Sequence, residues 1–199
     1  MTIKVLDAPP KRKSRKIPMS LIREELRGKA LYYKGYKEVI KGHKTLEEIM
    51  GSSSLQSVLV GLIYGILFSA INRKKYLLST NETGLHLGHK NNFSTDVAVF
   101  LKEKVSLNDK YFEVAPELAI EVDIKIDTDK EIDYLFSKSE EMLAFGTQTI
   151  CWILTKNKKI FVFRQNQNAQ ILEWNQDILL IENLTLNLQN LLDDEEIVC

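Results

Sequence analysis

The chain has 199 residues, 44% of them hydrophobic, so we expect one domain with its own core and not two. The 27 Lys and Arg residues equal the 27 Asp and Glu residues in number, which gives no support to nucleic-acid binding through bulk charge. Any basic surface must therefore be local. Two cysteines, Cys151 and Cys199, are too few for a disulfide framework or a zinc site, and they predict a reduced, cytoplasmic protein.

The first 18 residues hold three of the four prolines and a basic cluster at 11–16, a composition typical of a disordered or loosely docked tail. Such a cluster can contact phosphates, but a solubilising tail explains it equally well. We therefore predict a tail at 1–18 and a single domain at 19–199. The longest apolar segment, Leu55–Ile71, is interrupted by polar residues and glycine and is shorter than the ~20 apolar residues of a membrane span, so we expect a buried helix and no membrane partner.

The first half of the domain is predicted to be mainly helical, with one hairpin. In chain order, the patterns predict a short helix at 19–27, a hairpin at 29–41 around Lys34-Gly35, a short helix at 45–51 and a long helix at 53–71. Thr45 and Glu48 have capping-box spacing at the start of the second of these helices.

The second half is predicted to be mainly strands. Its elements are expected as strands at 76–80, 83–87, 96–101 and 118–125, a helix at 129–145 ended by Gly146, a hairpin of strands at 150–155 and 159–164, edge strands at 171–174 and 178–181, and a helix at 184–192. This order of elements predicts an α/β or α+β fold, with a mixed central sheet flanked by helices.

Acidic residues interrupt two of these strands, where a core strand favours Val and Ile. Asp96 begins one strand, and Glu121 and Asp123 lie in the next. Alternate residues of a strand share a face, so Glu121, Asp123 and Lys125 are predicted to project together. A buried carboxylate without a partner is costly, so such acids are usually paired, hydrogen-bonded or bound to a cation.

These residue types suit metal-assisted cleavage of a phosphodiester. If the strand of Asp96 pairs beside that of Glu121, their carboxylates and an ammonium meet at one point. Mg²⁺ binds carboxylate oxygens and keeps several waters, which leaves room for a phosphate. The ion can lower the pKa of a bound water, and a lysine can orient or deprotonate that water. The alternative from the residues alone is a half-exposed strand with a wet polar face, on which Lys125 pairs with an acid across the strand.

The chain also resembles a known family. It is similar to the PD-(D/E)XK restriction-endonuclease-like superfamily and, within it, to the Uma-type family of bacterial endonucleases. The resemblance covers roughly residues 20 to 192 and rests on Ser94–Phe100, Pro116–Val122, Lys138–Gly146 and Trp152–Leu154, with Glu25, Gly28, Tyr32–Gly35 and Ile49–Ser53. Two positions depart from the family pattern: Thr95 replaces the usual proline before the first acid, and Gln56 replaces a frequent histidine.

The resemblance implies an endonuclease that cuts DNA with Mg²⁺ or Mn²⁺, with Asp96 and Glu121 as metal ligands. It favours Lys138 as the catalytic lysine, because Uma-type proteins carry this lysine on the helix, eight residues before the glycine at its end. Lys125 satisfies the literal D/E-x-K spacing from Asp123 and is the second choice.

Asp123 and Glu25 are further candidate metal ligands. A homodimer would fit the family and would allow both strands of a duplex to be reached. The alternative function is that of a non-catalytic nucleic-acid-binding or accessory protein on the same fold.

Overall fold

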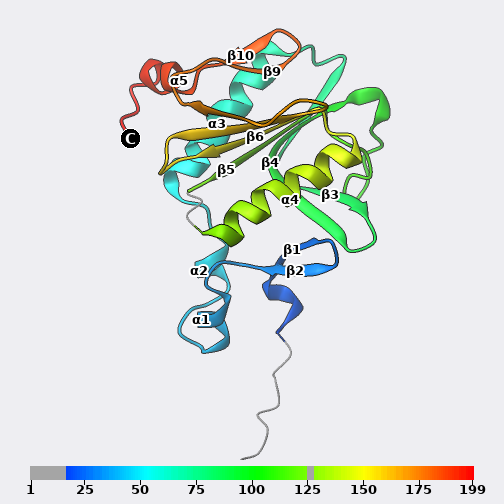
Figure 1. Cartoon of the computed structure of the whole chain (residues 1–199), viewed down its shortest axis with the longest axis vertical. Helices are drawn as coiled ribbons and strands as arrows, with labels where there is room; N and C mark the ends of the chain where they lie inside the picture. Colours follow the sequence, from blue (N-terminus) through cyan, green and yellow to red (C-terminus); the bar gives the residue numbers. More distant parts are fainter. Residues whose placement is uncertain (1–16, 125–127) are drawn as a thin grey trace, which may run out of the picture.

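The computed structural model describes residues 17–124 and 128–199. Lys125 and all but the last two residues of the predicted tail lie outside these ranges. Within them, a mixed sheet of eight strands forms the centre of the fold (Figure 1), in the order β2-β1-β4-β5-β6-β7-β8 with β3 paired to β4. The strands are β1 (Ile22–Leu26), β2 (Lys29–Tyr32), β3 (Tyr76–Gly88), β4 (Asn91–Leu101), β5 (Leu118–Asp123), β6 (Thr149–Leu154), β7 (Lys159–Arg164) and β8 (Gln170–Glu173).

The parallel pair β5 and β6 is the centre of this arrangement. Helix α4 (Asp129–Phe145) connects the two strands, as a crossover between parallel neighbours requires. The other ladders of this sheet are antiparallel. The predicted mixed sheet flanked by helices is therefore confirmed.

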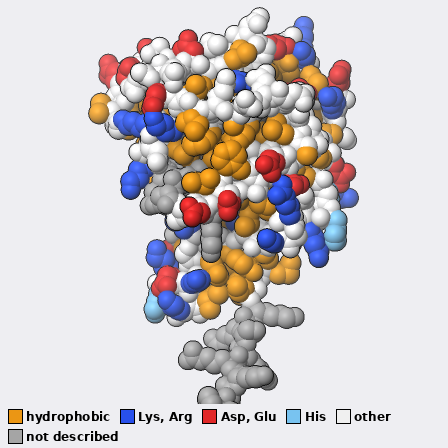
Figure 2. Space-filling model, viewed as in Figure 1, with side chains coloured by type: hydrophobic (Ala, Val, Ile, Leu, Met, Phe, Trp, Pro, Cys, Tyr) orange, Lys and Arg blue, Asp and Glu red, His pale blue; other side chains and the backbone are white. Residues whose placement is uncertain are grey.

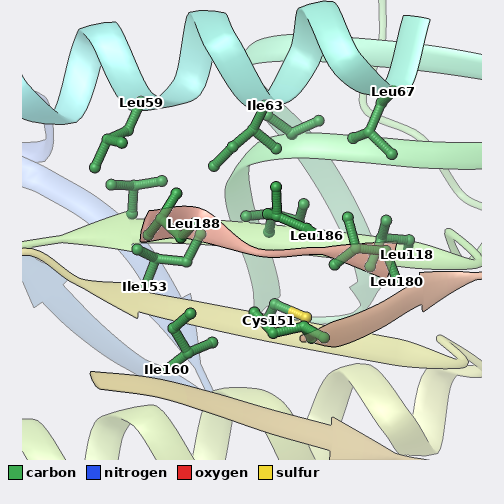
Figure 3. Packing of buried hydrophobic residues seen from close by; sticks show 14 of the residues in the cluster. Leu59, Ile63, Leu67, Leu118, Cys151, Ile153, Ile160, Leu180, Leu186 and Leu188 are labelled. Carbon is green, nitrogen blue, oxygen red and sulfur yellow. The ribbon is translucent and has the colours of Figure 1, made fainter. Parts of the chain in front are cut away.

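Helix α3 (Ser54–Ala70) covers one face of the sheet. Leu59, Ile63 and Leu67 recur every four residues, are excluded from solvent and point at the strands (Figure 3). The predicted start of this helix is confirmed: Ser53 and Gln56 form a capping box, in which each side chain accepts the other's backbone N–H. The same core also contains residues of a two-stranded sheet, β9 (Ile178–Ile181) with β10 (Leu184–Leu186), and of helix α5 (Leu188–Asp194).

Helix α4 lies against the opposite face of the sheet (Figure 1). Thr128 caps its start by accepting the N–H of Glu131, and Gly146 ends it with a φ of 120°, as predicted. Leu135 and Met142 are buried in the core on this side. Lys138 falls between them on the same stripe of the helix, so its ammonium is directed into the interior.

The N-terminal part of the domain differs from the prediction. Residues 19–27 are not one helix: a short 3₁₀ turn, η1 (Met19–Leu21), leads into strand β1. The hairpin also turns earlier than expected, at Arg27-Gly28, where both residues have positive φ. The Lys34-Gly35 segment instead leads into helix α1 (Tyr36–Ile40). Pairing of β1 with β2 and β4 decides the strand state, and neither contact is visible in local sequence.

Other boundaries differ in smaller ways. The two strands predicted at 76–80 and 83–87 are one long strand, β3, with a register shift at Asn81-Glu82. The helix predicted at 184–192 starts at Leu188 because β10 occupies the residues before it. Helix α2 (Glu47–Met50) ends before Gly51, as expected, and η2 (Lys102–Lys104) follows β4.

The surface agrees with the balanced composition. On the face seen in Figure 2, acidic and basic side chains are interspersed around a central group of hydrophobic ones. Within the part of the chain that the structure describes, no helix is long and apolar enough to cross a membrane.

Candidate functional site

Asp96 and Glu121 meet where β4 and β5 part. Val97 pairs with Ile120 in the antiparallel ladder, so one step further along the strands places Asp96 opposite Glu121 on the same face. The ladder does not continue there, because the Asp96 carboxylate (Oδ2) accepts the N–H of Val122 at 2.7 Å. Both acids line a pocket of about 610 Å³. The structure thus brings together the two acids that the sequence singled out.

Lys138 completes this cluster from helix α4. Its Nζ lies 2.8 Å from Glu121 Oε1, and the two side chains are 0% and 5% exposed. Through this contact Glu121 Oε1 is paired with the ammonium of Lys138 and buried, while the residue as a whole lines the pocket.

A third carboxylate, Glu24 of β1, lies on the other side of Lys138. Its Oε1 accepts from Lys138 Nζ at 2.8 Å, and the backbone N–H of Ser94 donates to the same oxygen at 3.1 Å. The Tyr134 hydroxyl donates to Oε2. Lys138 also donates to the carbonyl of Ser94 at 2.7 Å. Both oxygens of Glu24 are therefore occupied by protein donors.

Aromatic rings enclose the ammonium of Lys138. It lies between 5.5 and 5.8 Å from the ring centroids of Phe93, Tyr134 and Trp152, within the range of cation–π attraction. Trp152 is fixed in turn by a hydrogen bond of 2.9 Å from its Nε1 to Ser139 Oγ. This wall excludes water from one side of the cluster and leaves the pocket as its open side.

Burial and neighbouring charges separate the pKa values of the three carboxylates. Burial raises the pKa of Glu121 to about 8, with the nearby charge of Asp96 acting in the same direction. Burial also raises the pKa of Asp96, against the hydrogen bond from Val122. Burial acts in the same direction on Glu24, but the positive charges of Lys138 and Arg23 outweigh it and hold the pKa of Glu24 below its usual value. One ammonium cannot fully compensate two carboxylates, and Glu121 is the one left partly uncompensated.

The opposite shift occurs at the lysine. Burial alone would lower the pKa of Lys138, but the negative charges of Glu121 and Glu24 reverse this effect and raise it well above the usual value. Lys138 therefore stays an ammonium at neutral pH.

The donor set fits a hard divalent cation. Asp96 and Glu121 supply two carboxylates at one pocket. Mg²⁺ commonly binds through one or two carboxylates and fills its remaining positions with water and substrate phosphate. Within residues 17–124 and 128–199 there is no group of three or more acidic, His or Cys side chains placed to hold a metal by themselves, so waters or a substrate would have to supply the other ligands.

Comparison with known proteins identifies the family and the fold. Residues 38–193, well over half of the chain, match the family model described as "Uma2: Putative restriction endonuclease". The chain belongs to the Uma2 family. A crystal structure described as a putative nuclease belonging to DUF820, from Anabaena variabilis ATCC 29413, has the same fold, with a TM-score of 0.60 and 17% identity over 85% of this chain and 88% of that chain. No curated protein matches the sequence.

The other predicted residues of this Uma2 protein are placed differently. Asp123 lines the pocket at the end of β5, so it stays a further candidate ligand beside Asp96 and Glu121. Glu25 does not line this pocket: it pairs with Asn92 between β1 and β4, accepts from the Asn92 side chain at 3.2 Å and borders another hollow. Lys125 lies outside the described residues. Lys138, the lysine that the Uma-type resemblance favours, contacts Glu121 directly.

Sequence reasoning missed Glu24, the neighbour of Glu25. As a strand, β1 buries Leu26, and Glu24 shares that face because it lies two residues earlier. The signal was present but required β1 to be identified as a strand. Tyr134 was missed too, although it lies one helical turn before Lys138 on the same side of α4.

Two cationic side chains border the pocket of this Uma2 protein. Arg23 of β1 and Lys34, just after β2, line it together with Gln56 at the start of α3. The Gln56 side chain donates to the carbonyl of Val122 at 2.8 Å, which ties α3 to the end of the strand bearing Glu121. The pocket is thus lined by the acids Asp96 and Glu121 and, at its rim, by the cations Arg23 and Lys34. This pattern suits a metal at the acids and a phosphate between the metal and the rim.

Proposed function

We propose that this protein is a Mg²⁺- or Mn²⁺-dependent endonuclease that hydrolyses phosphodiester bonds in DNA. The observation that carries the proposal is the meeting of Asp96, Glu121 and the Lys138 ammonium at one pocket. Membership of a family described as restriction endonucleases supports a DNA substrate. A homodimer and a cytoplasmic location remain predictions from the sequence.

Asp96 and Glu121 would hold the cation, with Asp123 lining the same pocket. When bound, the ion supplies charge neutralisation at the phosphate and lowers the pKa of a bound water. The protein's own contribution is to fix two carboxylates on one face of paired strands. The hydrogen bond from the Val122 N–H holds the Asp96 side chain toward Glu121 before any ligand arrives.

Lys138 contributes a fixed positive charge. Because its pKa is raised by Glu121 and Glu24, it acts as an ammonium that orients groups and stabilises developing negative charge, and not as the base that deprotonates water. Its contacts to Glu24 Oε1 and the Ser94 carbonyl fix where this charge lies. Arg23 and Lys34 at the rim are placed to contact substrate phosphates.

One observation favours a second candidate function, nucleic-acid binding without cleavage. Among the described residues there is no cluster with three metal-ligating side chains, so these residues alone do not complete a cation site. A non-catalytic version would bind DNA through the rim but would not need a metal at Asp96 and Glu121.

Asp96→Asn separates the two functions. Asn keeps an oxygen that can accept the Val122 N–H, so the fold is retained while a charged metal ligand is lost. Supercoiled and linear DNA are incubated with the protein in Mg²⁺, Mn²⁺ or EDTA, and binding of Mn²⁺ is measured by calorimetry. We expect metal-dependent cleavage by the native protein and at least a ~100-fold loss in the variant.

The control is Asp109→Asn, which removes an exposed acid from the loop after η2. It should cleave like the native protein. Native protein that binds DNA but neither binds Mn²⁺ nor cleaves would support the non-catalytic function. Cleavage unchanged by Asp96→Asn would refute the assignment of the site.

A further inference from the structure

Glu24 comes to the site from outside the residues that match the family model. The family match begins at residue 38, whereas Glu24 lies on β1, the inner strand of the N-terminal hairpin. Its side chain is 1% exposed and sits against Lys138. A buried acid in this position is not explained by packing, because an apolar residue would fill the same space without the cost of desolvation.

The two acids that contact Lys138 differ in what remains free on them. Glu24 accepts hydrogen bonds at both oxygens, from Lys138, Ser94 and Tyr134. Glu121 pairs with Lys138 through Oε1 at 2.8 Å, and the residue lines the pocket. Both oxygens of Glu24 are thus occupied by protein donors, whereas Glu121 lies where a ligand in the pocket can reach it.

A cation at Glu121 changes the charge balance around the lysine. A Glu121 carboxylate shared with a divalent ion compensates the buried ammonium less, and the ammonium repels the ion. Glu24 then supplies the negative charge that keeps Lys138 in place 2.8 Å away. Without Glu24, Lys138 would rely on Glu121 alone and would compete with the ion for it.

We propose that Glu24 is a positioning residue: held by Tyr134 and Ser94, it shares the Lys138 ammonium with Glu121, so that Glu121 can bind a divalent cation without leaving the ammonium unpaired. This inference rests on the proposed function and adds to it a role for a residue of the N-terminal hairpin. Glu24 acts through Lys138 and does not itself contact the cation.

The test is a double-mutant cycle on metal affinity, with Glu24→Gln, Lys138→Met and their combination. The dissociation constant of Mn²⁺ is measured by calorimetry on the full chain without DNA, and thermal unfolding verifies that each variant is folded. We expect Glu24→Gln to weaken Mn²⁺ binding about tenfold in the native background. Without the Glu24 carboxylate, the Lys138 ammonium has Glu121 as its one paired carboxylate and competes with Mn²⁺ for it. In the Lys138→Met background the same change should have an effect of less than about twofold.

Glu25→Gln is the matched control. It is the same substitution one residue along the same strand, on an acid that contacts Asn92 and not the cluster, and Mn²⁺ affinity should be unchanged. A variant Tyr134→Phe, which removes one donor to Glu24 but no charge, should give a weaker effect in the same direction as Glu24→Gln.

The outcomes separate this proposal from the proposed function. If Glu24→Gln weakens Mn²⁺ binding equally with and without Lys138, Glu24 is a direct ligand and the positioning role is overturned. If native protein binds Mn²⁺ and cleaves DNA but Glu24→Gln behaves like Glu25→Gln, the positioning role is overturned while the nuclease stands. If native protein binds no Mn²⁺, the metal-dependent function fails, and with it the role assigned to Glu24.

Discussion

Lys138 Nζ and Glu24 Oε1 lie 2.8 Å apart, although the two residues are separated by 114 positions in the sequence and neither side chain is appreciably exposed. The contact ties the N-terminal hairpin to helix α4. It adds a buried ion pair to the exposed contacts that also hold the hairpin, among them those of Arg27 with Glu140 and Glu141. The ion pair therefore links the stability of the fold to the chemistry of the site.

Removing the ammonium should be costly to stability. Lys138→Met keeps the approximate volume but leaves Glu24 and Glu121 buried without a cation, and breaking a buried pair in this way typically costs about 3–5 kcal/mol. We expect a loss of that size in the free energy of unfolding, measured by urea denaturation followed by circular dichroism. Lys37→Met, at an exposed lysine of α1, should change it by less than about 0.5 kcal/mol. A loss below about 1 kcal/mol for Lys138→Met would show that the cluster is not compensated as described.

Metal binding should strengthen as pH rises toward the pKa of Glu121. Burial raises this pKa to about 8, so at neutral pH the folded protein holds a proton that a metal ligand must release. Below the pKa, the apparent affinity for Mn²⁺ at this carboxylate should rise by up to about tenfold per pH unit. Calorimetry from about pH 6 to about pH 8, in buffers of different ionisation enthalpy, measures both the affinity and the protons released.

The free energy of unfolding should depend on pH in the opposite direction to metal affinity. Because the pKa of Glu121 is raised above its ordinary value near 4.5, the folded state binds more protons than the unfolded state between these two pKa values. The free energy of unfolding should therefore fall as pH rises through about 5 to about 8. Glu121→Gln carries no titrating group and should flatten this part of the curve. An Mn²⁺ affinity independent of pH would contradict the shift.

The central part of the fold could be predicted from sequence because local signals agree with the tertiary structure there. Strand β5 is an apolar run, and α4 begins at a Thr128 cap and ends at a glycine with positive φ. Lys138 was assigned through its spacing to Gly146, and its place between the buried Leu135 and Met142 is a second signal of an inward-facing lysine. The meeting of Asp96 and Glu121 was expected only on the condition that their strands pair, and the structure has that pairing.

The N-terminal hairpin could not be predicted in this way. Strand β1 reads Ile-Arg-Glu-Glu-Leu, whose composition suits an exposed helix as well as a strand. Its conformation is decided by β2 and by β4, the latter some 67 positions away. The choice between Glu24 and Glu25 depends on that register, since consecutive strand residues face opposite sides. For this reason the sequence indicated the wrong member of the pair.

Gln56 should stabilise both the start of α3 and the end of β5. Its Oε1 accepts the Ser53 N–H in the capping box, and its Nε2 donates to the carbonyl of Val122, next to Glu121. Gln56→Ala removes both contacts, and we expect a loss of about 1–2 kcal/mol in unfolding free energy. Ser57→Ala, on the same helix, removes only a local bond to Ser54 and should cost much less.

The Gln56 variant should also affect the site. If Val122 is held less firmly, the carboxylate of Glu121 is positioned less well, and cleavage should fall more than stability alone explains. Activity is therefore measured well below the unfolding midpoint of the variant. Equal losses for Gln56→Ala and Ser57→Ala would indicate that only the helix cap matters.

Lys34 should contribute to DNA binding and not to chemistry. It lines the pocket rim with its side chain 80% exposed, and its ion pair with Glu131 at 3.4 Å is solvent-accessible and therefore weak. Lys34→Ala should weaken DNA binding several-fold. The slope of the logarithm of the binding constant against the logarithm of the salt concentration should fall by about 1, as expected for the loss of one phosphate contact. The measurement is fluorescence anisotropy at several salt concentrations, in the Asp96→Asn background so that DNA stays intact.

Lys44→Ala is the matched control for Lys34→Ala, because Lys44 is an exposed lysine of the segment before α2 that does not line the pocket. It should leave both the affinity and the salt slope nearly unchanged. If Lys44→Ala changes the salt slope as much as Lys34→Ala does, DNA lies along the whole segment from 34 to 44 and not specifically over the pocket. If neither variant changes it, the phosphates that flank the cleaved bond are contacted from another side of the site, and Arg23 is a further cation among the described residues that line the pocket.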